Sequence, residues 1–475
     1  MATPNTHYGK EGIAALLENC KHLFFIGIGG VNMSSLAEIS KNRGYRVSGS
    51  DHAETPITER LMRCGIPVFL THSAKNLLDA DAVIYTVAVP SDNPEYREAI
   101  RRGLPLISRA DYLGYIMTGY PRRIGLSGMH GKSTTTSMCA EIFMAAEADP
   151  TVASGAALRS IGGYYRIGEG DSFIFEACEY MDSFLDFYPT TAVILNMEMD
   201  HVDYFKSMEH IRSSYRKFAD KTTSEENGCV IYNADDENVC AALRDFEGTL
   251  LSFGVKAENR DKVDFFGADI REERGRYAFT VLYRGEAIAS VKLSVPGRHN
   301  VMNALAAFAA AYDAGLSPEA ITRGLARFCG AERRMEYKGE VNGCAVYDDY
   351  GHHPSEVRTT LEGAQRLTKG KLYCLFQPHT YSRTKSLFSE FSQAFDAVDG
   401  LFLVDIYAAR EIDTLGVSSA LLAEAIGDRA EYCPSFREAA DRLRETVSED
   451  DLLVVMGAGN VYDIFPLIGL SMPQV

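Results

Sequence analysis

The stretch from residue 123 to 136, with the sequence RIGLSGMHGKSTTT, constrains the fold more than any other part of the chain. Its apolar start predicts a strand, Gly128 and Gly131 predict a tight loop, and the pattern after Lys132 predicts a helix. Glycines allow successive backbone N–H groups to point at one anion, and a helix N-terminus adds partial positive charge. Lys132 would reach the terminal phosphates, and Ser133 would hold a magnesium ion. The stretch therefore predicts a cradle for a nucleoside triphosphate.

The spacing of this loop departs from the common G-x-x-x-x-G-K-[ST] pattern, because Leu126 lies five positions before Gly131. The loop is instead the shorter G-x-x-G-K-S. The alternative is a glycine turn that caps an ordinary helix, but the lysine and serine directly after the last glycine favour phosphate. We therefore expect the nucleotide to contact Gly128, Met129, His130, Gly131, Lys132, Ser133 and Thr134.

The bulk properties are those of a globular protein with several domains. A length of 475 residues predicts about three domains. No apolar run is long enough to cross a bilayer, and residues 1–10 lack the features of a secretory signal. The ten cysteines form no C-x-x-C pair, which favours a reducing compartment. Because no secretory signal is seen, we expect a cytoplasmic protein. The net charge of −17 opposes binding to nucleic acid or to an anionic membrane, so neither is an expected partner.

The first part of the chain has the pattern of a Rossmann-like domain. Residues 23–30, LFFIGIGG, predict a strand and a glycine turn, and a second strand leads into Ser50 and Asp51. The third glycine of G-x-G-x-x-G falls on Asn32, which weakens a nicotinamide interpretation and leaves a pocket for another diphosphate. The alternatives are an NAD-dependent oxidoreductase, or close packing without a ligand. The predicted substrate-binding residues here are Gly27, Gly29, Gly30, Ser50, Asp51 and His72.

Two strands that follow the phosphate loop end in acidic residues and a histidine. Residues 172–176 end in Glu176, and residues 191–196 are followed by His201. The carboxyl ends of parallel strands open onto one crevice, so both side chains would face the same ligand as Lys132. We select Glu176 and His201 as metal ligands and leave the neighbouring Glu179, Glu198 and Asp200 unassigned. Residues 221–296 are predicted to form polar antiparallel strands without chemistry.

A third α/β unit begins after residue 328. Its polar residues again follow predicted strands, in residues 346–354, 375–383, 403–411 and 455–460. We therefore predict domains at residues 1–119, 120–328 and 329–475, each with a parallel sheet.

Together these motifs resemble the Mur ligase family. The resemblance covers almost the whole chain and rests on residues 25–30, 128–136, 196–201, 298–303, 333–334, 348–354 and 376–383. It implies a Rossmann-like domain for a uridine nucleotide, a central P-loop ATPase domain and a Rossmann-like C-terminal domain for an amino acid. It also implies magnesium contacts from Ser133, Glu176 and His201, ATP contacts from Asn303, Arg334 and Asp349, and amino-acid contacts from Tyr350, His352 and Arg383. The implied catalytic residues are Lys132, Glu176, His201, His352 and Arg383.

The activity implied by the resemblance is ATP-dependent ligation of L-alanine to the lactyl carboxylate of UDP-N-acetylmuramate, through an acyl phosphate, in peptidoglycan precursor synthesis. ATP and Mg²⁺ are the implied cofactors, and a monomer or a homodimer is expected. Within the family, a murein tripeptide ligase is the nearest alternative, although Tyr350 and Gly351 before His352 favour alanine. A binding module that is switched by a nucleotide, without a synthetic reaction, is the alternative of another class.

Overall fold

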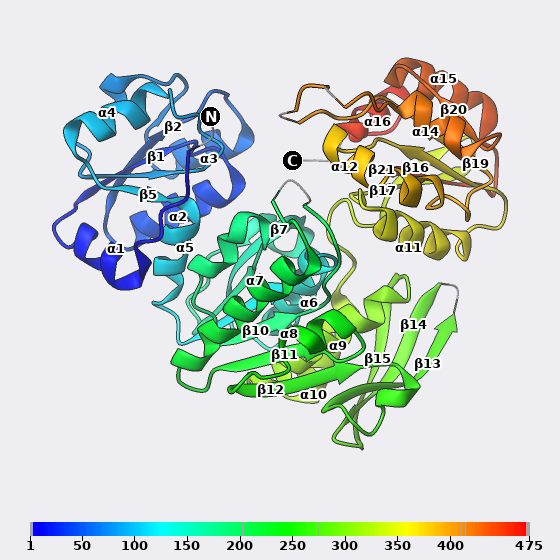
Figure 1. The fold of residues 1–475 in the computed structure, drawn as a ribbon, viewed down its shortest axis with the longest axis horizontal. Helices are drawn as coiled ribbons and strands as arrows, with labels where there is room; N and C mark the ends of the chain where they lie inside the picture. The colour runs from blue at the N-terminus through cyan, green and yellow to red at the C-terminus, as the bar shows by residue number, and fades with distance from the viewer. Residues whose placement is uncertain (1–2, 202–203, 274, 410, 414, 472–475) are drawn as a thin grey trace.

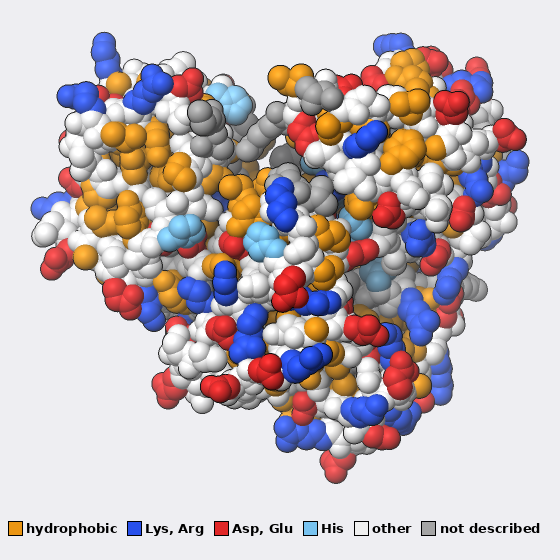
Figure 2. Space-filling view, in the orientation of Figure 1, with side chains coloured by type: hydrophobic (Ala, Val, Ile, Leu, Met, Phe, Trp, Pro, Cys, Tyr) orange, Lys and Arg blue, Asp and Glu red, His pale blue; other side chains and the backbone are white. Residues whose placement is uncertain are grey.

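Three lobes follow one another along the chain in the computed structural model, which describes residues 3–201, 204–273, 275–409, 411–413 and 415–471 (Figure 1). Each lobe is built on its own sheet with helices packed around it. The middle lobe lies below the other two in this view, and the same face is hollowed between the N-terminal and C-terminal lobes (Figure 2). The predicted α/β class with largely parallel sheets is confirmed. The boundaries predicted near residues 119 and 328 stay a prediction.

The N-terminal lobe has a five-stranded parallel sheet in the order β3-β2-β1-β4-β5. Its strands are β1 His22–Ile26, β2 Arg46–Ser50, β3 Val68–Phe69, β4 Ala82–Tyr85 and β5 Leu106–Ser108. Its helices are α1 Gly9–Leu17, α2 Val31–Asn42, α3 Pro56–Arg63, α4 Pro94–Arg102 and α5 Arg109–Met117, with a 3₁₀ turn at Ala74–Leu77. All five residues of β1 are buried, as expected for a central parallel strand.

The middle lobe has a ten-stranded sheet in the order β15-β14-β13-β12-β11-β10-β6-β9-β7-β8. Its strands are β6 Arg122–Ser127, β7 Thr151–Leu158, β8 Gly163–Arg166, β9 Ser172–Glu176, β10 Thr191–Ile194, β11 Cys229–Asn233, β12 Thr249–Gly254, β13 Phe265–Glu273, β14 Arg276–Tyr283 and β15 Glu286–Pro296. Its α-helices are α6 Lys132–Ala145, α7 Met208–Asp220, α8 Glu237–Ala242, α9 His299–Asp313 and α10 Pro318–Arg327. Its 3₁₀ turns are η2 Arg159–Ile161, η3 Tyr180–Asp186, η4 Lys221–Ser224 and η5 Ala257–Asn259.

The expectation of antiparallel strands throughout residues 221–296 is wrong for the first two strands of that range. β11 and β12 pair in parallel with each other, and β11 pairs in parallel with β10. The short helix α8 between them provides the crossover that parallel pairing requires. Only β13, β14 and β15 form the predicted antiparallel part within this described range.

The C-terminal lobe has a six-stranded sheet in the order β16-β17-β21-β18-β19-β20, parallel except for the β16–β17 pair. Its strands are β16 Glu336–Val341, β17 Cys344–Asp349, β18 Leu372–Phe376, β19 Gly400–Leu403, β20 Ala430–Tyr432 and β21 Leu452–Met456. Its helices are α11 Pro354–Gln365, α12 Tyr381–Ser386, α13 Phe388–Ser392, α14 Ser419–Ile426, α15 Phe436–Thr446 and α16 Ile464–Leu467, with a 3₁₀ turn at Val461–Asp463. In the described part of the chain, none of the helices combines the length and apolar character that crossing a bilayer requires.

The N-terminal and middle lobes share one hydrophobic core. The cluster that contains Leu23 and Ile84 of the first sheet continues into Phe175 and Ile194 of the second. Neighbouring residues on β9 and β10 point to the opposite face, where they pack in a second cluster with α6, α9 and α10. Separating these two lobes would expose their shared apolar core to water, so the two lobes form a single packed unit.

The crossing of α5 and η3 inside this shared core depends on a glycine. A Cβ atom at Gly114 would lie 1.9 Å from the carbonyl oxygen of Asp186, which is backbone and cannot rotate away. We expect Gly114→Ala to lower the free energy of unfolding by about 1–3 kcal/mol through overpacking, measured by urea denaturation. Gly363→Ala is the matched control, since its nearest neighbour would lie 3.8 Å away and alanine favours the helix. Equal effects of the two substitutions would contradict the proposed crossing.

Candidate functional site

The phosphate loop lies between the end of β6 and the start of α6, as predicted from its sequence. Gly128 has φ +145° and Gly131 has φ +81°, and these are conformations that glycine adopts without steric cost. A Cβ atom at Gly131 would lie 2.5 Å from Oδ1 of Asn303, so the loop packs closely against α9. The loop therefore needs glycine both for its own turn and for the approach of Asn303.

The ammonium group of Lys132 is folded over its own loop. Its Nζ donates to the carbonyl oxygens of Gly128 at 2.5 Å and Met129 at 3.1 Å. It also forms an ion pair of 3.0 Å with Glu179, whose side chain is 1% exposed. Burial alone would lower the pKa of Lys132, but the Glu179 carboxylate raises it above its ordinary value. Lys132 is thus a partly buried cation, with a side chain 13% exposed and an acidic partner, directly at the helix N-terminus.

The predicted metal ligands Ser133 and Glu176 are in direct contact. Oγ of Ser133 donates to Oε2 of Glu176 at 2.7 Å, and the backbone N–H of Gly155 donates to the same oxygen at 3.0 Å. A Cβ atom at Gly155 would lie 2.4 Å from that oxygen, so this position must be glycine for Glu176 to reach Ser133. His201 has φ +48°, and its Nε2 lies 3.5 Å from Glu179. The oxygen pair offered by Ser133 and Glu176 suits a hard cation such as Mg²⁺.

Two cavities meet at the phosphate loop. The first, of about 340 Å³, is lined by the predicted nucleotide residues His130, Gly131, Thr134, Asn303, Arg334 and Asp349. The second, of about 520 Å³, is lined by Met129, Lys132, Ser133, Glu176 and His201 from the middle lobe and by Tyr350, His352 and Arg383 from the C-terminal lobe. The predicted metal ligands and amino-acid residues thus face one chamber. Gly131, Arg334 and Glu356 line both cavities, so they form the wall between them.

Arg383 joins the C-terminal lobe to the middle lobe within the second cavity. Its Nε and Nη2 each lie 3.1 Å from Oδ1 of Asp200, and its Nη1 lies 3.2 Å from Nδ1 of His379. Burial would raise the pKa of Asp200, but the guanidinium holds it well below its usual range. The nearby His352 directs Nδ1 to the carbonyl oxygen of Tyr350 at 3.0 Å, and burial lowers its pKa. A neutral imidazole and a guanidinium therefore line the same wall.

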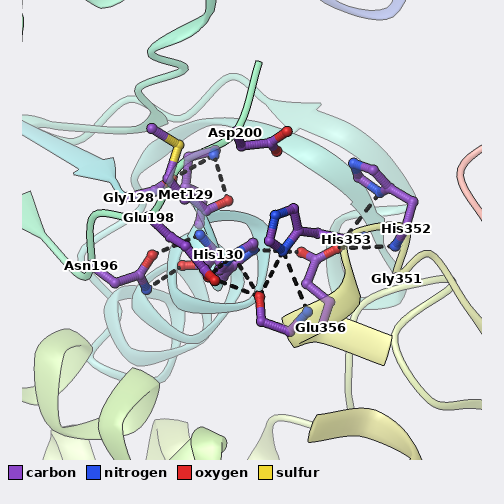
Figure 3. A network of polar contacts seen from close by, with 12 residues as sticks. Gly128, Met129, His130, Asn196, Glu198, Asp200, Gly351, His352, His353 and Glu356 are labelled. Carbon is purple, nitrogen blue, oxygen red and sulfur yellow. Dashed lines mark hydrogen bonds and ion pairs between the residues drawn. The ribbon is translucent and has the colours of Figure 1, made fainter. Parts of the chain in front are cut away.

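A second polar network crosses the two lobes at His130 (Figure 3). Its Nε2 lies 2.9 Å from Glu198 of the middle lobe, and its Nδ1 lies 3.1 Å from Glu356 of the C-terminal lobe. Burial would lower the pKa of His130, but hydrogen bonds to Glu198 and Glu356 raise it to about 9. The ring is therefore held as an imidazolium between two carboxylates at neutral pH.

His130, Glu198 and His353 offer ligand atoms within 4.8 Å of one another, a spacing that a metal ion could bridge. The hydroxyl of Ser355 lies among them, at 3.2 Å from His130 Nε2, 2.8 Å from Glu198 and 2.7 Å from His353 Nδ1. Ser355 thus contacts all three groups, while the buried Nε2 of His353 has no hydrogen-bond partner among the described residues, and we interpret the cluster as a polar seam between lobes.

The predicted substrate residues of the N-terminal lobe gather at the carboxyl ends of β1 and β2. The backbone N–H of Gly27 donates to the carbonyl oxygen of Ser50 at 2.8 Å, and the N–H of Gly29 donates to Oδ2 of Asp51 at 2.8 Å. The described residues that line the two cavities all lie at position 129 or beyond, so the predicted substrate residues of the N-terminal lobe lie outside both cavities.

Ser50 and His72 share an acidic partner that the sequence did not indicate. Glu95 has no exposed side-chain surface, and its Oε2 lies 2.7 Å from both Oγ of Ser50 and Nδ1 of His72. Asn76 donates to its other oxygen at 2.7 Å. Glu95 therefore fixes the orientation of His72, while the Ser50 hydroxyl is committed to this internal network.

The structure adds contacts that the sequence does not assign. Glu179, Glu198 and Asp200, which the sequence leaves unassigned, each pair with a predicted site residue: Lys132, His130 and Arg383 respectively. Glu356 and Gly155 also contact site residues, namely His130 and Glu176. Glu356 lies three residues after the helix N-cap His353, at the spacing of a capping box, but a histidine N-cap falls outside the usual Ser, Thr, Asp or Asn pattern.

The charged state of His130 makes a pH-dependent contribution to stability. Its pKa of about 9 in the folded chain exceeds the unfolded value of about 6.5. The contribution is therefore complete below about pH 6.5 and is lost as pH rises towards 9. We expect the unfolding free energy of the wild type, relative to His130→Asn, to fall by about 1 kcal/mol or more from pH 6 to pH 9 in urea titrations. A difference between wild type and His130→Asn that stays constant from pH 6 to pH 9 would contradict this contribution.

Comparison with known proteins gives a consistent assignment. Residues 22–121 match the model "Mur ligase family, catalytic domain", residues 126–311 match "Mur ligase middle domain", and residues 333–459 match "Mur ligase, glutamate ligase domain". The chain is 47% identical to a UDP-N-acetylmuramate–L-alanine ligase of Acetivibrio thermocellus, over 94% of both chains, and 43% identical to one of Caldanaerobacter subterraneus, over 94% and 97%. The structure of a UDP-N-acetylmuramate-alanine ligase from Thermotoga maritima matches with a TM-score of 0.76 and 29% identity, over 93% of this chain and 97% of that one. The chain belongs to the Mur ligase family.

Proposed function

We propose that this chain ligates L-alanine to the lactyl carboxylate of UDP-N-acetylmuramate at the expense of ATP, in the synthesis of peptidoglycan precursors. The observation that carries this proposal is the cavity of about 520 Å³, where Lys132 of the phosphate loop and Arg383 of the C-terminal lobe line one chamber. A reaction that activates one substrate with phosphate and transfers it to another needs both ends in one space. The relatives named above support the choice of L-alanine and UDP-N-acetylmuramate.

The chemistry follows from the poor reactivity of a carboxylate. The lactyl carboxylate attacks the γ-phosphorus of ATP, ADP leaves, and an acyl phosphate forms. The neutral amine of L-alanine then attacks the acyl carbon, the C–O bond to phosphate breaks, and the nitrogen loses one proton, so that amide, phosphate and a proton result. Lys132 would balance the negative charge that develops on the transferred phosphoryl group.

The residues of the C-terminal lobe would hold the amino acid. Arg383 would bind its carboxylate, because a guanidinium matches a carboxylate with two parallel hydrogen bonds. His352 would accept a hydrogen bond from the amine through Nε2, since Nδ1 faces the Tyr350 carbonyl. In the N-terminal lobe, Gly27, Gly29, Gly30, Asp51 and His72 would bind the uridine diphosphate.

Magnesium fits the residues of the middle lobe. Ser133 and Glu176 would hold it through oxygen atoms that already lie 2.7 Å apart, with His201 on the same chamber wall. A bound magnesium ion would neutralise charge on the β- and γ-phosphates. Asn303, Arg334 and Asp349 would contact the rest of the nucleotide in the smaller cavity.

The function is tested by measuring phosphate release from ATP with UDP-N-acetylmuramate and a panel of amines, with the amide product identified by mass. We expect release and product with L-alanine above glycine or L-serine. Product with a murein tripeptide and none with L-alanine would instead identify a tripeptide ligase. Nucleotide binding without phosphate release for any amine would contradict a ligase and favour a switched binding module.

Loss of the loop cation should abolish most activity. We expect Lys132→Ala to lower kcat at saturating ATP by about a hundredfold or more, because one preorganised charge contact in the transition state is removed. Circular dichroism should show that the fold is kept. Lys369→Ala, at a side chain 83% exposed, is the control and should retain full activity. An unchanged rate for Lys132→Ala would remove the loop from the mechanism.

Removal of the metal ligands should change the need for magnesium. We expect Glu176→Ala and His201→Ala each to raise the Mg²⁺ concentration for half-maximal activity, since each removes one ligand. Magnesium titrations of both variants, beside the exposed Glu169→Ala, provide the comparison. If the curves of all three coincide with the wild type, the assignment of ligands is wrong.

A further inference from the structure

The carboxylate of Glu356 contacts residues of both the middle lobe and the C-terminal lobe. Its Oε1 lies 3.1 Å from Nδ1 of His130, across the seam between the lobes (Figure 3). Its Oε2 accepts the backbone N–H groups of His352 at 3.0 Å and His353 at 3.3 Å. The side chain is 12% exposed and lines both cavities. Glu356 thus lies between the chamber of the amino acid and the pocket of the nucleotide.

His130 is part of the phosphate loop, and both its backbone and its ring are held by the segment that follows β10. The side chain of Asn196 binds the backbone of His130 twice, accepting from its N–H at 2.9 Å and donating to its carbonyl oxygen at 3.0 Å. Glu198 holds the other nitrogen of the ring at 2.9 Å. A displacement of this ring would therefore displace the loop whose N–H groups would hold phosphate.

Helix capping explains only part of the contacts of Glu356. At position N3 of α11, a glutamate accepts the N-cap N–H through one oxygen, and Oε2 does so here. The capping function leaves Oε1 free to face solvent, yet Oε1 points across the seam to His130, with Nη1 of Arg334 at 3.9 Å. The second oxygen thus connects the helix that follows Tyr350 and His352 to the phosphate loop.

We propose that Glu356 is a positioning residue that holds the phosphate loop in a fixed position relative to the amino-acid site. Phosphoryl transfer would then occur only when the C-terminal lobe is in place. This inference deepens the proposed function and rests on it for the identity of the acceptor. Water must be kept from an acyl phosphate, and the amine must lie close to it. A correctly positioned loop therefore prevents the cleavage of ATP without formation of an amide. Without this contact the enzyme would still bind nucleotide, but it would cleave more than one ATP for each amide bond formed.

The first test needs no substrate. Hydrogen exchange of the full-length protein, followed by mass spectrometry, is compared for wild type, Glu356→Gln and Glu362→Gln, an exposed glutamate on the same helix. We expect Glu356→Gln to speed exchange in peptides covering residues 128–135, whereas Glu362→Gln leaves them unchanged. Faster exchange confined to residues 354–365 would mean that Glu356 only caps its helix, and would overturn the proposal.

The second test measures coupling. With ATP, Mg²⁺, UDP-N-acetylmuramate and L-alanine, the wild type should release one phosphate per amide bond. We expect Glu356→Gln to form the amide about 10–100-fold more slowly, with more than one phosphate released per amide, and Glu362→Gln to stay close to the wild type. His130→Asn should produce the same loss, and the double variant should lose no more than either alone.

The outcomes separate the two proposals. A wild type that forms no amide from L-alanine overturns the proposed function, while the exchange experiment still decides the role of Glu356. A wild type that forms the amide, beside a Glu356→Gln variant that keeps one phosphate per amide, overturns the positioning role alone. Losses for Glu356→Gln and His130→Asn that add in the double variant would also overturn it, because the two residues would then act separately.

Discussion

The ion pair between Lys132 and Glu179 is the interaction on which the site depends. An ammonium group that is largely shielded from water carries a desolvation cost unless a carboxylate lies close by, and Glu179 lies 3.0 Å away with almost no exposed surface. The pair holds the lysine over the carbonyl oxygens of its own loop and keeps it charged. Strand β9 positions this arrangement, because Glu176 at its end contacts Ser133 and Glu179 follows directly. The loop, the lysine and the proposed metal ligands Ser133 and Glu176 are therefore held together.

The two boundaries between lobes differ in their chemistry. The N-terminal and middle lobes share an apolar core, so their relative position is set by packing that resists separation. In the candidate site, the contacts of the C-terminal lobe with the middle lobe are polar, such as Arg383 with Asp200 and His130 with Glu356. Polar interfaces of this kind are typical of domains that move relative to one another. Movement of the third lobe against the first two is therefore the motion that the fold favours.

Much of the site could be predicted from the sequence because its motifs are local. The phosphate loop is one continuous stretch, and Glu176 and His201 follow strands whose carboxyl ends meet at one edge. The orientation of β11 and β12 was missed, because their partial burial gives no clear pattern and α8 is short. Gly155 and Glu95 act through contacts between distant segments, which a single sequence does not reveal. The alternative function of an NAD-dependent oxidoreductase rests on the glycine turn within residues 23–30 and gives Lys132 no role.

Each of three cations in the site already has an acidic partner: Lys132 with Glu179, Arg383 with Asp200, and His130 with Glu198 and Glu356. The site is thus charged but internally neutralised. An anionic ligand would enter by exchange of partners, displacing or sharing carboxylates that already occupy the cations. Such an exchange creates little net field far from the site, so ligands would be selected by fit at short range rather than by attraction at a distance. For a chain with a net charge of −17, this allows anions to bind without a positive surface.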